Sequence, residues 1–138
     1  MIIQDFTIEK YGWSVRVYYE FEDWTLPMLK EELYALGGYE DDLNEIMDTI
    51  AKRTKNTGYI FSNIYERRSI IIIEKTTSSA EFQDTFDHEK GHLAMHICIA
   101  ENIDPFSEEY QYLVGEIGHT MFKAAKRFLC DNCRRKNS

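Results

Sequence analysis

Apolar and polar residues alternate with a period of two at the start of the chain, from residue 2 to residue 21. The apolar members of this pattern are Phe6, Ile8, Tyr11, Trp13, Val15, Val17 and Tyr19. Because successive side chains of a strand point to opposite faces, the pattern predicts two strands, and Gly12 between the runs favours a hairpin. Two later apolar runs, at residues 59–62 and 69–75, are also expected to be strands.

Two segments between these strands carry apolar residues at helical spacing. Residues 26–36 have Pro27 in the first turn and are followed by Gly37, which is typical of a short helix. Residues 41–53 place their apolar side chains on one face and predict a second helix. Residues 55–58 then supply a turn.

Two longer helices are expected in the second half of the chain. Ser78 and a glutamate three positions later form the capping-box pattern, so a helix is expected to begin there and to run to about Ala100. A proline-containing break follows. The last helix is expected to be capped by Asp104 or Ser107 and to continue to about Leu129.

These elements predict one α+β domain that spans residues 1–138. We expect a small, mainly antiparallel N-terminal sheet with short helices, followed by two long packed helices. Apolar residues make up 43% of the chain and aromatic residues 14%, enough burial to offset the entropy of ordering. Residues 130–138 are expected to form a frayed basic tail.

The formal net charge of −8 is unevenly distributed. Six of the 16 basic residues but one of the 24 acidic residues lie from Lys123 onward, which leaves 10 basic and 23 acidic residues in the first 122. Such a negative field repels phosphate backbones, so nucleic-acid binding by the main domain is not expected. The basic segment from Lys123 to Lys136 is the candidate for any nucleic-acid contact.

The chain shows neither a membrane span nor a secretory signal. Its longest apolar run, residues 70–73, is far shorter than the ~20 residues that a span needs. The odd number of cysteines (Cys98, Cys130 and Cys133) then favours reduced thiols and a cytoplasmic location. Cys130 and Cys133 have CxxC spacing, but no second pair completes a structural zinc site, so we interpret the pair as incidental.

Residues 88–92 read His-Glu-Lys-Gly-His, an HExxH motif inside the first long helix. Residues four apart lie on one helical face, so His88 and His92 can bind one metal ion. Glu89 is rotated about 100° from His88, which places its carboxylate beside the ion as a base for metal-bound water. The imidazole ligands and the absence of a redox role favour Zn²⁺.

A catalytic zinc normally needs a third protein ligand and an open position for water. His96 continues the four-residue spacing, but eight residues of helix rise about 12 Å, too far for both ends to bind one ion. On a helical wheel of the last helix, Glu109 and Glu116 flank the apolar stripe, whereas Glu108 and His119 point away. Glu109 and Glu116 both remain candidates on this ground.

Residues 87–93 and 107–115 resemble the small HExxH proteins of phage, prophage and conjugative-element genomes, which are minimal zincins of the gluzincin kind. Members of this family carry a strand before the HExxH helix and a second helix that opens with a glutamate and an AYLxG-like run. Gln111 stands here where alanine is usual. The resemblance covers roughly residues 70–121 and, more weakly, the N-terminal hairpin.

The resemblance implies that His88, His92 and Glu109 bind the zinc and that Glu89 is the general base of a metallopeptidase-like hydrolase. Its substrate would be a peptide or amide. No residue is assigned to stabilise the oxyanion, and the candidates are Tyr110, Tyr112, His96 and His119. Asp84 or Asp87 could orient a ligand imidazole, although Asp87 is expected to face away from it.

Two other hypotheses remain open at this point. The first is a non-catalytic binding or structural protein of a mobile element, in which any metal site is vestigial or structural. The second is nucleic-acid contact through the basic C-terminal segment. An open coordination position would favour catalysis over a structural metal, and a steep loss of binding with salt would indicate nucleic acid.

Overall fold

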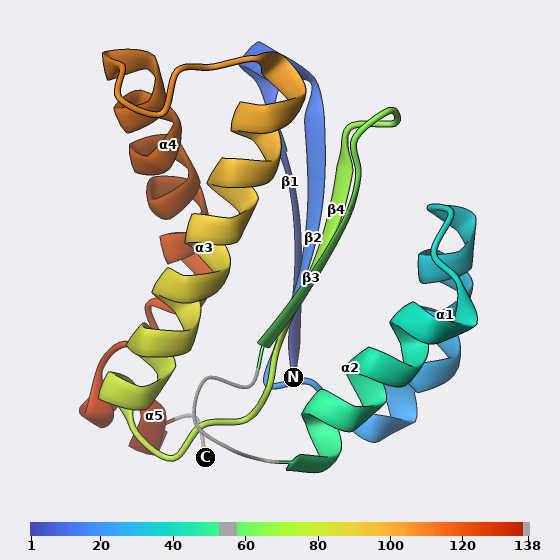
Figure 1. The fold of residues 1–138 in the computed structure, drawn as a ribbon. Coiled ribbons are helices and arrows are strands. Elements are labelled where there is room, and N and C mark those ends of the chain that lie inside the picture. The colour runs from blue at the N-terminus through green and yellow to red at the C-terminus, as the bar shows by residue number, and fades with distance from the viewer. Residues whose placement is uncertain (53–57, 137–138) are drawn as a thin grey trace.

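The computed structural model describes residues 1–52 and 58–136. Figure 1 shows three layers, with a four-stranded sheet between two pairs of helices. The strands are β1 (Ile2–Ile8), β2 (Trp13–Tyr19), β3 (Gly58–Asn63) and β4 (Arg68–Ile73). The helices are α1 (Leu26–Ala35), α2 (Glu40–Lys52), α3 (Ser79–Glu101), α4 (Glu108–Ala125) and α5 (Asp131–Lys136). The predicted α+β class is confirmed.

The sheet is mixed, in the order β1-β2-β4-β3. β1 pairs antiparallel with β2, and β3 pairs antiparallel with β4, whereas β2 and β4 are parallel. The predicted N-terminal hairpin is confirmed; its connection is a 3₁₀ turn, Glu9–Tyr11, closed by Gly12 at φ 59°. Because parallel neighbours need a crossover, the chain between β2 and β4 passes over one face of the sheet and places α1 and α2 there. β3 is left as an edge strand.

The two long helices begin where side-chain caps satisfy their first backbone N–H groups. Ser78 Oγ accepts a hydrogen bond from the Glu81 N–H, as the capping-box pattern predicts. Ser107 Oγ accepts from the Tyr110 N–H, so the cap of α4 is Ser107 and not Asp104. α4 ends before the expected limit, at Ala125. The predicted end of α2 at residue 53 and most of the turn at 55–58 lie outside the described residues, and Gly58 is the first residue of β3.

Two hydrophobic cores lie on opposite faces of the sheet. Ile71 and Ile73 join the core beneath α3 and α4, and Ile70 and Ile72 join the core beneath α1 and α2. The run of isoleucines is therefore buried on both faces, which explains why it lacks a polar alternation. The helix α3 thus rests on the same core as α4, and the pair forms one layer.

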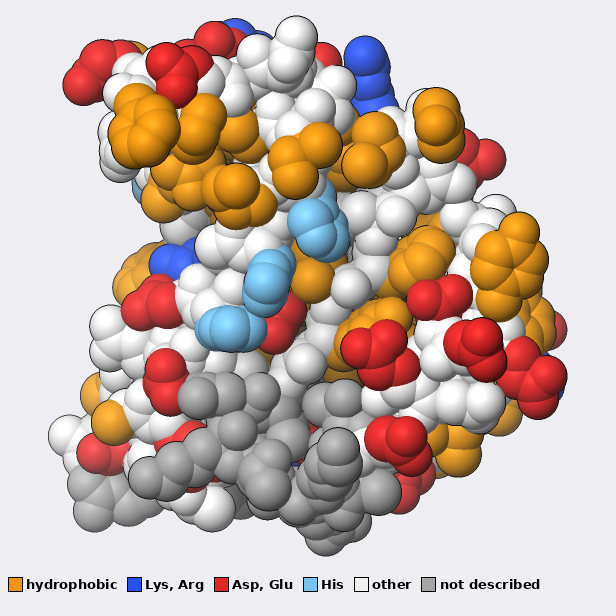
Figure 2. All heavy atoms as spheres, in the orientation of Figure 1, with side chains coloured by type: hydrophobic (Ala, Val, Ile, Leu, Met, Phe, Trp, Pro, Cys, Tyr) orange, Lys and Arg blue, Asp and Glu red, His pale blue; other side chains and the backbone are white. Residues whose placement is uncertain are grey.

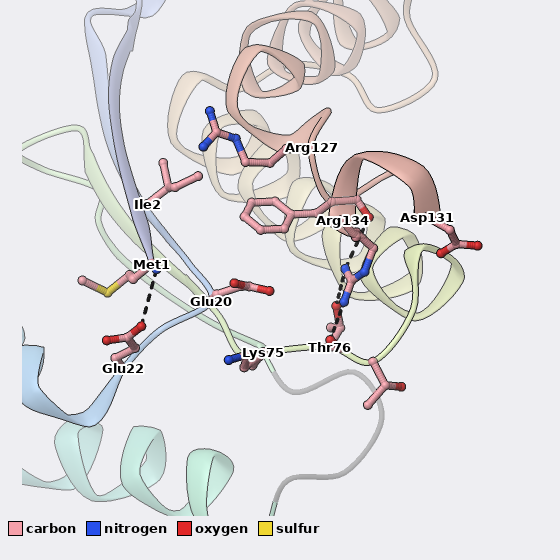
Figure 3. Close-up of a pocket in the computed structure, with 11 residues that line it drawn as sticks. Met1, Ile2, Glu20, Glu22, Lys75, Thr76, Arg127, Asp131 and Arg134 are labelled. Atoms are coloured by element: carbon pink, nitrogen blue, oxygen red, sulfur yellow. Dashed lines mark hydrogen bonds and ion pairs between the residues drawn. The ribbon is translucent and has the colours of Figure 1, made fainter. Parts of the chain in front are cut away.

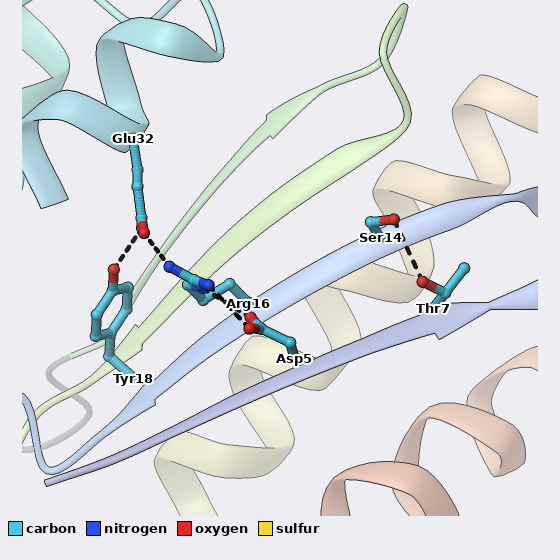
Figure 4. A network of polar contacts seen from close by, with 6 residues as sticks. All are labelled: Asp5, Thr7, Ser14, Arg16, Tyr18 and Glu32. Carbon is cyan, nitrogen blue, oxygen red and sulfur yellow. Dashed lines mark hydrogen bonds and ion pairs between the residues drawn. The ribbon is translucent and has the colours of Figure 1, made fainter. Parts of the chain in front are cut away.

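The α1–α2 layer is also joined to the sheet by polar contacts (Figure 4). Arg16 donates two hydrogen bonds to the Asp5 carboxylate, at 2.7 and 2.8 Å. Arg16 and the Tyr18 hydroxyl also donate to Glu32 of α1. These side chains connect β1, β2 and α1.

The C-terminal segment, expected to be frayed, contains a short helix with defined contacts. Arg134 of α5 donates hydrogen bonds to the Thr76 hydroxyl, to the Thr76 carbonyl and to the Phe128 carbonyl. Asp131 accepts one from the Ser79 N–H at the start of α3. α5 lines an open cavity of about 950 Å³ together with Met1, Ile2 and the segment that follows β4 (Figure 3).

None of the helices described is both long enough and apolar enough to cross a membrane.

Candidate metal centre

The imidazoles of His88 and His92 converge on the exposed side of α3. Their Nε2 atoms are 3.1 Å apart and their ring centroids are 4.7 Å apart. Two nitrogen ligands of one tetrahedral zinc, each about 2.0–2.1 Å from the metal, lie roughly 3.3 Å apart. The separation of the two nitrogens therefore suits a single ion.

Glu89 lies one residue further, on the side of α3 that faces β3. Its side chain is 2% exposed, and its Oε2 atom has no hydrogen-bond partner among the described residues. Burial raises the pKa of its carboxyl group to about 7. Burying a carboxylate without a hydrogen-bond partner costs free energy, and a carboxyl group whose pKa lies near neutrality is suited to accept a proton.

Gly58, at the start of β3, makes room for Glu89. A Cβ atom at this position would lie 2.8 Å from Oε1 of Glu89 and 2.9 Å from its Cγ, closer than real Cβ contacts allow. The sequence pattern predicts only a turn at Gly58 and does not reveal that this glycine makes room for Glu89. A glycine at the start of an apolar strand is the only sequence feature that points to this role, and a glycine that ends a turn gives the same pattern.

Glu109, the ligand implied by the family resemblance, has other partners. Its Oε1 accepts a hydrogen bond from the Tyr11 hydroxyl at 2.8 Å and lies 3.3 Å from Lys10 Nζ. The Tyr11 hydroxyl, and with it Lys10, lowers the pKa of the Glu109 carboxyl. Glu116, the alternative, is exposed on α4. Within residues 1–52 and 58–136, no group of three or more His, Cys, Asp or Glu side chains is arranged to hold a metal ion.

The packing of α4 explains why Glu109 is not brought to the histidines. Lys90 projects from the side of α3 that faces α4, since its Nζ atom lies 3.5 Å from the position of a Cβ atom added to Gly118 of α4. Lys90 is two residues from His88, which is about 200° around the helix. His88 therefore faces away from α4. The helical wheel of α4 predicts that Glu109 flanks the apolar stripe, but it contains no information about which flank of α3 is covered by α4.

The remaining candidates of the sequence analysis are dispersed. Asp87 pairs with Lys90 at 3.0 Å, consistent with its expected outward direction. The Tyr110 hydroxyl donates to Met95 Sδ at 3.8 Å, and Tyr112 is 74% exposed. His119, Asp84 and Cys130 are exposed, and none of the three cysteines, all within the described residues, forms a disulfide.

His96 is the candidate that the structure places beside the pair. Its ring centroid lies 6.3 Å from that of His92. Its Nδ1 atom is 2.6 Å from Ser62 Oγ of β3, and burial, followed by the charge of His92, lowers its pKa. Figure 2 shows imidazoles in a row on this face, beside a hollow whose other side carries acidic side chains over α1 and α2.

The residues on this face fit a zinc ion through their donor chemistry. Two imidazole nitrogens converge, and Glu89, whose buried Oε2 atom has no described partner, directly follows His88 in α3. No family model, no curated protein and no solved structure matches this chain.

Proposed function

We propose that this protein binds a zinc ion through His88 and His92 and hydrolyses a peptide or amide bond with Glu89 as general base. The observation that carries the proposal is the 3.1 Å separation of the two Nε2 atoms. The same separation allows an N–H···N hydrogen bond between two neutral rings. A zinc ion would take the place of the shared proton at nearly the same nitrogen–nitrogen distance.

The chain's own residues would perform distinct tasks in this reaction. A bound zinc would supply a water of lowered pKa and would polarise a carbonyl group. Glu89 would act as the base toward such a water, since its Oε2 atom has no hydrogen-bond donor among the described residues. Gly58 lets the carboxylate stay in place against β3, and the close strand backbone excludes solvent from one side of it.

Zinc titration of the metal-free protein tests the metal site. We expect about one zinc per chain, measured by competition with a chromophoric chelator. His88→Gln and His92→Gln should each abolish tight binding, whereas His119→Gln, an exposed histidine of α4, should leave it unchanged. A wild-type protein that takes up no zinc refutes the proposal.

The chemistry is tested with a synthetic peptide library and mass spectrometry. The zinc-loaded wild type should produce new peptide termini, and Glu89→Gln should keep the metal and lose this activity. Equal cleavage by both proteins would remove Glu89 from its role. Because the described residues provide two ligands and no third, a non-catalytic protein with a vestigial metal site is the second candidate. Stoichiometric zinc without any cleavage favours that candidate.

A further inference from the structure

A line of hydrogen bonds runs from the core of the sheet to His96. The indole Nε1 of Trp13 donates to Ser69 Oγ at 2.8 Å. Ser69 Oγ lies 2.6 Å from Ser62 Oγ, which in turn lies 2.6 Å from Nδ1 of His96. The line crosses β2, β4 and β3 before it reaches α3, and its first two members are 0% and 2% exposed.

The buried end of this line fixes its direction. An indole N–H can only donate, so Ser69 Oγ must accept from Trp13. The Ser69 hydroxyl is buried and needs an acceptor for its own proton, and Ser62 Oγ is the partner found for it. If Ser62 instead donated to Ser69, the proton of Ser69 would be left without a described acceptor. Nδ1 of His96 is the one other partner of the Ser62 hydroxyl among the described residues, so Ser62 donates its own proton to that nitrogen.

This direction determines the tautomer of His96. A ring whose Nδ1 accepts a hydrogen bond is neutral and carries its proton on Nε2. Nε2 is on the opposite edge of the ring from Ser62, and no hydrogen-bond partner for it occurs among the described residues. A nitrogen that carries a proton cannot coordinate a metal, but it can donate to an oxygen atom.

We propose that Trp13, Ser69 and Ser62 position His96 as the Nε2–H tautomer, so that His96 donates a hydrogen bond to the carbonyl oxygen of a bound amide and does not serve as a third metal ligand. The inference rests on the function proposed above, because it places the amide beside His92. An N–H group aimed at an oxygen that gains negative charge stabilises the transition state of hydrolysis. In this arrangement Ser62 is a positioning residue, and His96 is the group that contacts the substrate.

The tautomer is measured in metal-free protein by long-range ¹H–¹⁵N correlation spectra of the histidine rings at pH 8. The wild type should show His96 protonated on Nε2. Ser62→Ala should populate the Nδ1–H form, Ser62→Thr should restore the wild-type pattern, and Ser14→Ala, a serine of β2 outside the line, should change nothing. An Nδ1–H ring in the wild type, or an unchanged ring in Ser62→Ala, overturns the inference.

The role toward an oxygen ligand is measured with zinc and acetohydroxamate, a small zinc-binding molecule that has a carbonyl oxygen. His96→Ala should leave zinc affinity within about threefold of wild type, whereas His92→Ala should lower it roughly 100-fold or more. Acetohydroxamate should bind the zinc-loaded His96→Ala protein about tenfold more weakly than wild type, because one hydrogen bond is lost. His96→Gln, which keeps an N–H donor, should recover part of this loss.

The outcomes separate the two proposals. Loss of zinc binding in His96→Ala to the same extent as in His92→Ala would make His96 a ligand and overturn the inference while the metal site stands. Equal acetohydroxamate affinity in wild type and His96→Ala would overturn the donor role. A wild-type protein that shows the Nε2–H ring but binds no zinc refutes the proposed function, and with it the substrate contact, but leaves the positioning by Ser62 supported.

Discussion

Replacing Glu89 by glutamine should remove the loss of stability that the metal-free protein undergoes as the pH rises through neutrality. The carboxyl is 2% exposed, and burial raises its pKa from 4.5 to about 7. A carboxyl with a raised pKa in the folded state contributes stability that is complete below pH 4.5 and is lost as the pH rises through about 7. Glutamine is nearly isosteric and does not ionise, so the variant does not undergo this loss.

The magnitude follows from the two pKa values. At 1.36 kcal/mol per pH unit, a rise from 4.5 to about 7 makes the wild type lose roughly 2.5 kcal/mol of unfolding free energy between pH 5 and pH 8 that the variant keeps. The comparison between two pH values cancels the cost of burying the glutamine amide, which is about the same at both.

Urea unfolding followed by tryptophan fluorescence, with a chelator present, measures this difference. Trp13 is fully buried and reports on the core that supports α3. Glu31→Gln, an exposed glutamate of α1, is the matched control and should follow the wild type at every pH. If the stability of Glu89→Gln depends on pH as steeply as that of the wild type, the carboxyl is solvated in solution and the reasoning fails.

Three further changes test the surroundings of the site. Gly58→Ala should lower the unfolding free energy by about 1–3 kcal/mol, because the added Cβ would contact Glu89. In a double-mutant cycle, adding Glu89→Ala should recover most of that loss. Additive effects of the two substitutions would show that the residues do not touch. Zinc at a free concentration 100 times its dissociation constant should raise the unfolding free energy by about 2.7 kcal/mol in calorimetry, and His88→Gln should remove this gain. Glu109→Gln should leave zinc affinity unchanged, because Tyr11 and Lys10 are its partners; a tenfold or greater loss would restore Glu109 as a ligand.

Much of the architecture follows from local patterns. Ser78 begins α3 because its hydroxyl caps the Glu81 N–H, and four residues of sequence are enough to predict that contact. The HExxH spacing likewise places His88 and His92 together, since helix geometry alone determines which side chains are neighbours. The first two strands were predictable from their periodicity and the later two from their apolar runs, but the parallel pairing of β2 with β4 joins segments that no local pattern relates.

The rest of the site depends on contacts between distant residues. Glu109 meets Tyr11 across 98 positions, and His96 meets Ser62 across 34. Which flank of α3 receives α4 is decided by the packing of the whole core, and one helical wheel does not contain that information. For the same reason a glycine that accommodates a carboxylate, such as Gly58, cannot be told from a glycine of a turn until its neighbour is known.

The isoleucines of β4 are divided between two cores, and one of the two cores carries the helix with the histidines. A change of side-chain volume at Ile72 disturbs the packing of α1 and α2, whereas the same change at Ile71 disturbs the packing of α3 and α4. A change of volume in the core beneath α1 and α2 should therefore disturb the imidazole face less than an equal change in the core beneath α3 and α4.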